Sequence, residues 1–183
     1  MHPIEDLTKE HGPIKLMLRI LERINEKIVN GEPIATADLN DGVTFIKEFA
    51  DKCHHGKEEA LLFPAMKKNN IRKEIELIDI LVAEHAEGRG YVKNIVEAIS
   101  QKGDNLKNFA EVFVDNSKKY ITLLDQHIDK ENVILFPEAN ASLSEAQLKE
   151  LASGFENVEK NIIGEKRHEE LYGIVHKLKA TYL

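Results

Sequence analysis

The stretch HHGKEEALLFP at residues 54–64 returns as HIDKENVILFP at residues 127–137. In both copies a Glu follows a His by four positions, and Phe-Pro follows the same His by nine and ten positions. Because Phe-Pro fixes the register, the counterpart of His127 is His54, the first histidine of the doublet. The chain thus repeats a motif of residue types that ligate metal ions.

A second pair of matching segments shows that the repeat is longer than this motif. LTKEHGPI at residues 7–14 matches LVAEHAEG at residues 81–88 at Leu, Glu and His. The shift between the copies is 74 positions here and 73 positions at the Phe-Pro motif. We therefore interpret the first 140 residues as a duplicated unit of two elements.

Apolar residues recur at helical intervals along the whole chain, as in IKLMLRILERINEKIV at residues 14–29. We expect a second helix capped by Asp38 that stops or kinks near Pro64, and a third helix over 74–101. A fourth is expected from about Leu106 to Pro137. A fifth should open with the capping box of Ser144 and Gln147 and bend at Gly154 or Gly164.

These elements predict an all-α fold. Four long helices with short connections favour an up-down-up-down four-helix bundle made of two duplicated helical hairpins. The bundle is expected to span residues 1–140, and residues 141–183 are expected to form a C-terminal helical extension packed on it within the same domain.

Composition limits the function and the compartment. A formal net charge of −7 argues against nucleic acid as a partner, because that partner requires a basic surface. The single cysteine, Cys53, forms no intramolecular disulfide, and the N-terminus lacks the apolar run of a signal peptide. No apolar stretch is long enough to span a bilayer. We therefore expect a cytoplasmic protein without a membrane partner.

The spacing of the repeated motif has a chemical consequence. Residues four apart lie on one face of a helix, so each His-x-x-x-Glu offers an imidazole and a carboxylate to one point. Four imidazoles and two carboxylates in a bundle core require a compensating charge, which a dinuclear metal centre supplies. Nitrogen and oxygen ligands with open positions favour iron, with manganese as the alternative, over a structural zinc. The candidate ligands are His11, His54, Glu58, His85, His127 and Glu131.

Other candidates are set aside at this point. His55 and Glu59 share the four-residue spacing, but on an α-helix they lie about 100° away from the first pair. We interpret His2, His168 and His176 as ordinary surface or core histidines, and Cys53 as a small buried apolar residue. A ferritin-like site would need a Glu-x-x-His on two helices, and the chain has one, at Glu165–His168.

The ordered set of His11, HHGKEEALLFP, His85 in AEHAEG and HIDKENVILFP resembles the hemerythrin-like HHE cation-binding family over about residues 5–140. The resemblance implies a four-helix bundle with two iron ions (Fe2+ or Fe3+) joined by an oxo or hydroxo bridge. It implies that His11, His54, His85 and His127 are terminal ligands, and that Glu58 and Glu131 bridge both ions.

One position departs from the oxygen-carrying members of that family. They have a second histidine one turn after the third-helix histidine, where this chain has Gly88 and Arg89. Their asymmetric arrangement, three histidines on one iron and two on the other, is therefore expected to be missing, which argues against an oxygen carrier. The remaining six ligands are closer to the iron–sulfur repair and nitric-oxide-response branch, although that branch has an additional N-terminal cysteine-bearing domain.

Three functions follow from the resemblance. The first is a module that binds or senses O2, NO or peroxide at an open metal position, with a protein partner or a homodimer left open. The second is a di-iron enzyme, namely a peroxidase, an oxidase or an NO reductase. Tyr120, two turns before His127, could then reach the pocket as a hydrogen-bond donor or radical site, although an ordinary core tyrosine is the favoured interpretation. The third is iron donation or iron–sulfur cluster repair.

Overall fold

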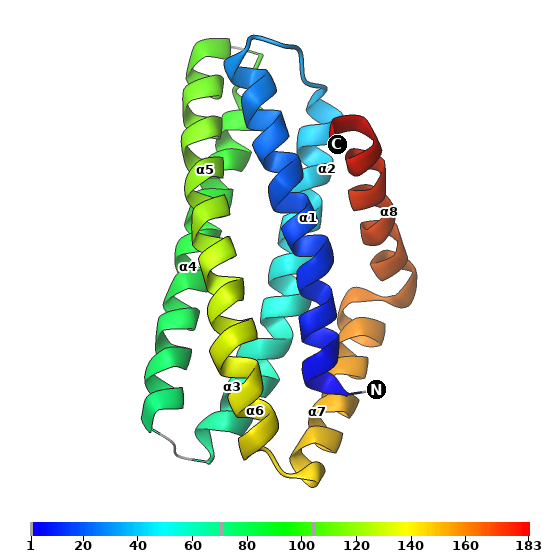
Figure 1. Cartoon of the computed structure of the whole chain (residues 1–183). Helices are drawn as coiled ribbons and strands as arrows, with labels where there is room; N and C mark the ends of the chain where they lie inside the picture. The colour runs from blue at the N-terminus through cyan, green and yellow to red at the C-terminus, as the bar shows by residue number, and fades with distance from the viewer. Residues whose placement is uncertain (1, 70–71, 104) are drawn as a thin grey trace.

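The computed structural model describes residues 2–69, 72–103 and 105–183, and it confirms the all-α fold class. Figure 1 shows long helices running side by side along the molecule. The bundle helices are α1 (Pro3–Val29), α2 (Thr36–Phe45) with η1 (Ile46–His55), η2 (Glu58–Leu62) and α3 (Phe63–Lys67), α4 (Arg72–Ser100), and α5 (Leu106–Lys130) with η3 (Glu131–Leu135) and α6 (Phe136–Ser142).

The four bundle helices run alternately up and down and form two hairpins, as the repeat predicts. α1 and the continuous run from α2 to α3 form the first hairpin, and α4 and the run from α5 to α6 form the second (Figure 1). α5 packs against both α4 and α1, so the hairpins contact each other along their length. Matching positions of the two hairpins consequently face a shared interior.

The segments η1, η2 and η3 are π-helical, and two of them explain the Phe-Pro motif. η2 and η3 begin at Glu58 and Glu131 and end immediately before Phe63 and Phe136. Proline lacks an N–H, and its ring clashes with the carbonyl of an α-helical turn. The wider π turn precedes each proline, and the helix continues beyond it. The helix does not end at Pro64 itself, since α3 runs to Lys67, and the irregularity expected near Pro64 is the π segment η2 that precedes it.

A polar layer divides the apolar core of the bundle into two clusters. Along α1, Ile4 and Leu7 belong to the lower cluster, His11 lies in the layer, and Ile14 belongs to the upper cluster. The other bundle helices cross the same three levels. The lower cluster also contains Leu62, Phe63, Met66, Ile78, Leu81, Leu135 and Phe136, and the upper cluster contains Phe45, Phe49, Val92, Ile95, Phe113, Tyr120 and Leu124.

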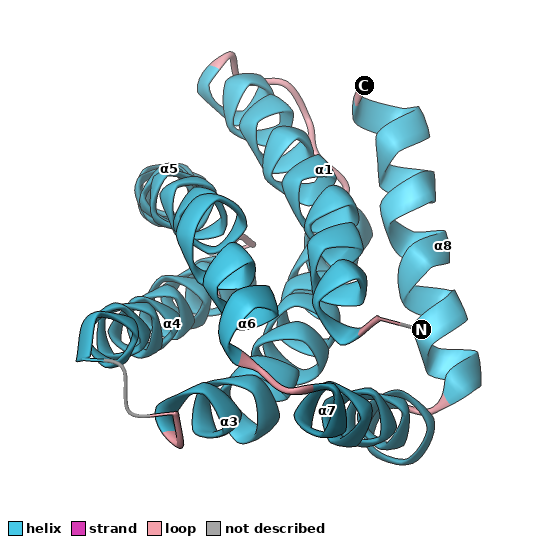
Figure 2. Cartoon of the chain, turned by 60° about the horizontal axis from the view of Figure 1, so that its bottom comes forward, coloured by secondary structure: helices cyan, strands magenta, loops and turns pink. Residues whose placement is uncertain are grey.

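The C-terminal residues form α7 (Glu145–Asn157), η4 (Val158–Ile163) and α8 (Glu165–Tyr182). α7 and α8 lie along the outside of α1 (Figure 2), and α8 also contacts α2. The capping box at Ser144 and Gln147 is confirmed. The chain bends at Gly164, whose φ of +94° lies in the left-handed region that favours glycine. Leu171, Val175 and Leu178 of α8 join the upper apolar cluster.

The expected cap at Asp38 is wrong. The N-cap of α2 is Ala35, and Asp38 lies within the first turn. Its carboxylate instead accepts a hydrogen bond from the Tyr182 hydroxyl at 2.9 Å and lies 3.1 Å from the Lys177 ammonium. Asp38 therefore helps to hold the end of α8, a tertiary role that no local pattern predicts. Among the described residues, no helix combines the length and apolar character needed to cross a membrane.

Packing of α7 against the bundle depends on the glycine at position 154. A Cβ there would lie 3.0 Å from Leu61 Cδ1. We expect Gly154→Val to lower the free energy of unfolding by about 1–3 kcal/mol, because the added side chain overpacks this contact. Denaturant unfolding followed by circular dichroism measures the effect.

Gly173→Val in α8 is the matched control, because a Cβ at Gly173 meets no atom within 4 Å. Equal stability of the two variants would show that α7 does not depend on close approach to Leu61.

Candidate metal centre

The polar layer of the bundle contains all six predicted ligands. α1 supplies His11, α4 supplies His85, and the π-helical runs and their flanks supply the two His-x-x-x-Glu pairs. The structure brings these side chains together in the interior, where none is more than 3% exposed. They divide into two groups around the carboxylates of Glu58 and Glu131.

Each carboxylate lies between two pairs of imidazoles. In one pair the Nε2 atoms of His11 and His54 are 3.0 Å apart, and in the other those of His85 and His127 are 2.9 Å apart. The two oxygens of Glu131 lie 3.2 Å from His11 Nε2 and 3.1 Å from His127 Nε2. Those of Glu58 lie 3.6 Å from His54 Nε2 and 3.5 Å from His85 Nε2. Both carboxylates therefore reach from one pair to the other.

A hydrogen-bond acceptor fixes the other nitrogen of each of these imidazoles. The Nδ1 atoms of His54, His85 and His127 donate to carboxylates, at 2.9, 2.7 and 2.9 Å respectively. That of His11 donates to an amide oxygen at 2.9 Å. Because Nδ1 carries the proton, each neutral ring presents the lone pair of Nε2 to the layer, as in metal-binding histidines. The acceptors are Glu10 for His54, Glu59 for His85, Glu84 for His127 and Asn132 for His11.

This arrangement leaves a surplus of acceptors that a cation would compensate. Two Nε2 lone pairs face each other in each pair, and the buried oxygens of Glu58 and Glu131 have no hydrogen-bond donor among the described residues. Unpaired buried acceptors and charges are costly. The donor set of imidazole nitrogens and carboxylate oxygens fits two metal ions, one at each pair.

The pKa values of the layer reflect the same conflict. Burial and the nearby charge of Glu131 raise the pKa of Glu58 well above its ordinary value. Burial alone would raise the pKa of Glu131, but His127 and His11, when protonated in the metal-free layer, hold it well below its ordinary value. Burial lowers the pKa of His54 to about 4. Without a metal ion, burial and mutual repulsion oppose the simultaneous ionisation of Glu58 and Glu131.

His55 lies at the site, so its dismissal in the sequence analysis is wrong. Its side chain is 5% exposed and groups with Glu58, His85 and His127. Its ring stacks on that of His85 with centroids 3.8 Å apart. The sequence estimate assumed α-helical rotation, whereas His55 ends the π-helical segment η1, in which neighbouring residues are separated by a smaller rotation. A third imidazole is therefore available on the side of His85 and His127.

Arg89, one turn after His85 on α4, supports the site from outside. Its guanidinium donates to Asp51 at 2.8 Å and to Glu59 at 2.7 Å. Glu59 is the acceptor for His85, and Asp51 Oδ1 lies 3.5 Å from His55 Nδ1. Arg89 thus fixes the carboxylates behind two histidines.

The residues behind the ligands repeat with the hairpins, and the sequence analysis missed their role. Glu10 contacts His54 and the Lys57 ammonium, and its counterpart Glu84 contacts His127 and Lys130. Because of His54 and Lys57, the pKa of Glu10 falls to about 2 despite burial. The signal was available, because Glu precedes His in both LTKEHGPI and LVAEHAEG.

Lys57 also ties the layer to the C-terminal helices. Its side chain is fully buried, with its ammonium 2.5 Å from Glu159 of η4 and 2.6 Å from Glu10. A further group of Glu10, Cys53 and His168 lies near this contact. Glu10 is already occupied by Lys57 and His54, and burial raises the pKa of the Cys53 thiol to about 12. We therefore assign no metal to this group.

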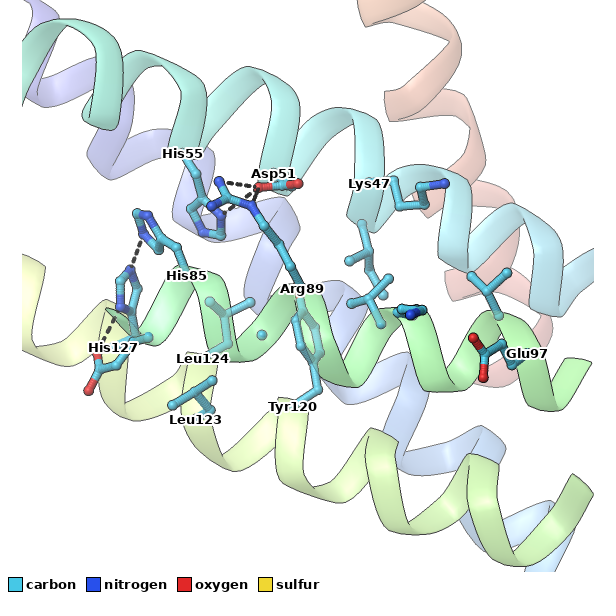
Figure 3. A pocket seen from close by; sticks show the side chains of 16 residues that line it. Lys47, Asp51, His55, His85, Arg89, Glu97, Tyr120, Leu123, Leu124 and His127 are labelled. Atoms are coloured by element: carbon cyan, nitrogen blue, oxygen red, sulfur yellow. Dashed lines mark hydrogen bonds and ion pairs between the residues drawn. The ribbon is translucent and has the colours of Figure 1, made fainter. Parts of the chain in front are cut away.

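A cavity of about 430 Å³ leads to the second imidazole pair. Figure 3 shows His55, His85 and His127 at one end of the cavity, and Lys47 and Glu97 at the other. Tyr120 belongs to the upper apolar cluster, which confirms the core interpretation, and its side chain also lines this space. The pairs therefore differ in access, and the cavity adjoins the pair that has His55.

The raised pKa of Glu58 predicts a pH dependence for protein stripped of metal by a chelator. Between its ordinary pKa and its raised folded pKa, the folded state binds the proton that the unfolded chain releases. The free energy of unfolding should therefore fall as pH rises through this window, by up to about 1.4 kcal/mol per pH unit. Thermal unfolding across this pH range measures it.

Glu58→Gln should flatten this dependence in metal-free protein and destabilise metal-loaded protein, which loses a ligand. Glu138→Gln is the control, because Glu138 is an exposed carboxylate on α6. If the stability of metal-free Glu58→Gln protein still falls as pH rises, Glu58 is not the group responsible for the pH dependence.

Comparisons with known proteins agree with this geometry. The family model described as the hemerythrin HHE cation binding domain matches residues 2–139. Three mycobacterial relatives are each 23% identical to the chain over 161 residues. They are Uncharacterized protein Mb2018 of Mycobacterium bovis and Uncharacterized proteins MT2051 and Rv1995 of two Mycobacterium tuberculosis strains. The matches cover 88% of this chain and 62% of each relative, so the chain spans less than two thirds of their length.

Proposed function

Because the chain belongs to the hemerythrin HHE cation-binding domain family, we propose that it holds two iron ions and binds or senses O2, NO or peroxide. One observation carries the proposal. Two pairs of facing Nε2 atoms flank the buried carboxylates of Glu58 and Glu131, which accept no hydrogen bond from the described residues. An oxo- or hydroxo-bridged iron pair would supply redox chemistry and an exchangeable position for such ligands.

The residues that would hold the ions follow from the two groups. His11 and His54 would hold one ion and His85 and His127 the other. Glu58 belongs to both groups, and Glu131 contacts His11 and His127, so both carboxylates would be shared. His55 would supply a third imidazole to the ion held by His85 and His127. This adds the asymmetry of three and two histidines that the sequence analysis counted as missing, although the third histidine comes from a different helix.

Iron is favoured by the chemistry of the donors. The layer contains no thiolate and combines imidazoles with carboxylates, a set that suits iron and, as the alternative, manganese. The carboxylates that accept from Nδ1 strengthen the imidazoles as ligands and fix their orientation. We further propose the cytoplasm as the compartment, since the single cysteine needs no oxidising environment.

A di-iron enzyme, a peroxidase, oxidase or NO reductase, is the second candidate. The cavity beside His55 is far larger than a diatomic ligand needs, since a water molecule occupies about 30 Å³. It also brings the phenol ring of Tyr120 into the same space as His85 and His127. Iron donation is less well supported, because the six ligands are buried and their imidazoles are held by hydrogen bonds.

Metal analysis tests the ligand assignment. Protein purified from iron-replete cells should contain about two irons per chain. Glu58→Ala and Glu131→Ala should each remove most of this iron, because each carboxylate contacts both imidazole pairs. One tightly held zinc, or iron content indifferent to both substitutions, would contradict the proposal.

The histidine doublet provides a matched comparison within the same experiment. We expect His54→Ala to lose iron, because it removes half of one imidazole pair. His55→Ala should retain both ions but shift the visible charge-transfer bands, since His85, His127 and the shared carboxylates remain. Iron loss in His55→Ala with retention in His54→Ala would reverse the roles of the two histidines.

Optical spectroscopy separates the candidate functions. Exposure of the reduced protein to O2 or NO, and of the oxidised protein to peroxide, should change the charge-transfer absorption. Reversible change supports binding or sensing, and repeated consumption of peroxide or NO supports the enzyme. We expect the burial of the ligands to slow transfer of iron to a chelator to hours. Transfer within minutes would favour donation.

A further inference from the structure

The cavity beside the three histidines has more room and a different lining than a small oxidant requires. Its volume of about 430 Å³ lies within the range of about 300–1,000 Å³ typical of sites for organic ligands. η1, α4 and α5 each contribute to its wall. The apolar part of the lining consists of Ile46, Gly88, Val92, Val96, Tyr120, Leu123 and Leu124.

The charges of the lining are not all balanced. Asp51 is paired with Arg89, and Glu84 is paired with Lys130 and His127. Lys47 and Lys93 line the same cavity, are exposed, and have no ion-pair partner among the residues that the structure describes. Glu97 is the one lining carboxylate that those residues also leave unpaired, so two ammonium groups and one carboxylate lack a partner, although the lining as a whole has three cationic and three acidic side chains.

The lysines and the histidines lie at different levels of the cavity. Lys93 follows His85 by eight residues on α4, which is about 12 Å along the helix axis. Apolar side chains occupy the wall over this distance, including Val92 of α4 and Leu123 and Leu124 of α5. The cavity therefore has one end with a net positive charge, formed by Lys47, Lys93 and Glu97, an apolar middle, and an end formed by imidazoles. Figure 3 shows Lys47 and Glu97 at the first end and the three imidazoles at the other.

We propose that this cavity binds a medium-chain acyl carboxylate. The alkyl chain would lie along the apolar wall, and the carboxylate would lie at the end formed by Lys47 and Lys93. Burial of the chain provides the affinity, and the two ammonium groups select an anionic head group over a neutral one. The other end of the ligand would approach His55, His85 and His127.

Gly88 makes the space for this ligand in the middle of α4. A Cβ at Gly88 would lie 3.5 Å from the Tyr120 ring and 3.8 Å from Leu123, so a small side chain fits without a clash. A larger side chain would extend into the volume that the alkyl chain needs. Gly90, two residues later, is exposed and would place a Cβ within 4 Å of nothing, so it is a matched control on the same helix.

Isothermal titration of the full-length, iron-loaded protein with decanoate tests the proposal, with decanol as the neutral probe. We expect decanoate to bind one equivalent per chain, at least about tenfold more tightly than decanol. Gly88→Leu should weaken decanoate binding about tenfold or more, and Gly90→Leu should leave it unchanged. Absence of decanoate binding, or an equal effect of the two leucine variants, would overturn the proposal.

The lysines are tested separately from the apolar wall. Lys47→Gln with Lys93→Gln should reduce decanoate affinity about tenfold and leave decanol affinity unchanged. Lys52→Gln with Lys118→Gln changes the net charge equally at exposed positions outside the lining, and it should have no effect. Decanol binding as tightly as decanoate would overturn the assignment of the cationic end.

Iron analysis of the same samples keeps this inference distinct from the proposed function. Protein with two irons that does not bind decanoate would refute the cavity ligand alone. Protein that binds decanoate but never retains iron would refute the di-iron proposal alone. Circular dichroism of each variant shows that the loss of binding does not reflect loss of the fold.

Discussion

The bundle depends on one electrostatic constraint, the presence of unprotonated imidazole nitrogens and two carboxylates in an apolar interior without donors to satisfy them. Nε2 atoms face each other at 3.0 and 2.9 Å, and the carboxylates between them receive no hydrogen bond from the described residues. Apolar clusters above and below shield the layer from water, except where the cavity reaches the second imidazole pair. The same packing that makes the layer costly without cations makes it a strong site for them, because fixed ligands in a dry interior need little reorganisation when a cation binds.

The π-helical segments determine how the helices direct their side chains into this layer. Glu58 and Glu131 each begin a π segment, and each segment ends before a Phe-Pro. The wider turn lets the helix continue past a residue that lacks an N–H, and it also changes the direction in which the side chains project. In η1 the same geometry turns two consecutive histidines, His54 and His55, towards the layer. The repeated Phe-Pro is thus part of how the ligands are positioned.

The repeat was sufficient to predict the fold class and the grouping of the six side chains, because spacing and order survive folding unchanged. The position of His55 was not predictable from an α-helical period, because η1 is π-helical and its residues are separated by a smaller rotation. Asp38 failed as a cap for a similar reason, because its partners Tyr182 and Lys177 are more than a hundred positions away. Glu10 and Glu84 were visible as repeat matches, but their hydrogen bonds to His54 and His127 form only when the two helices of each hairpin pack together.

The two halves agree in the residues that hold the carboxylates and imidazoles, and they differ in the residues that shape access. Glu10, His54 and Lys57 have equivalents in the second half, whereas His55 corresponds to Ile128 and Glu59 to Asn132. These two differences lie on the side of His85, where the cavity opens. Duplication alone would produce two ions in matching environments. Under the proposed function, divergence at the two positions would give one ion a third imidazole, a charged support through Arg89 and a route to solvent, so the chemistry of the centre is expected to be concentrated on that side.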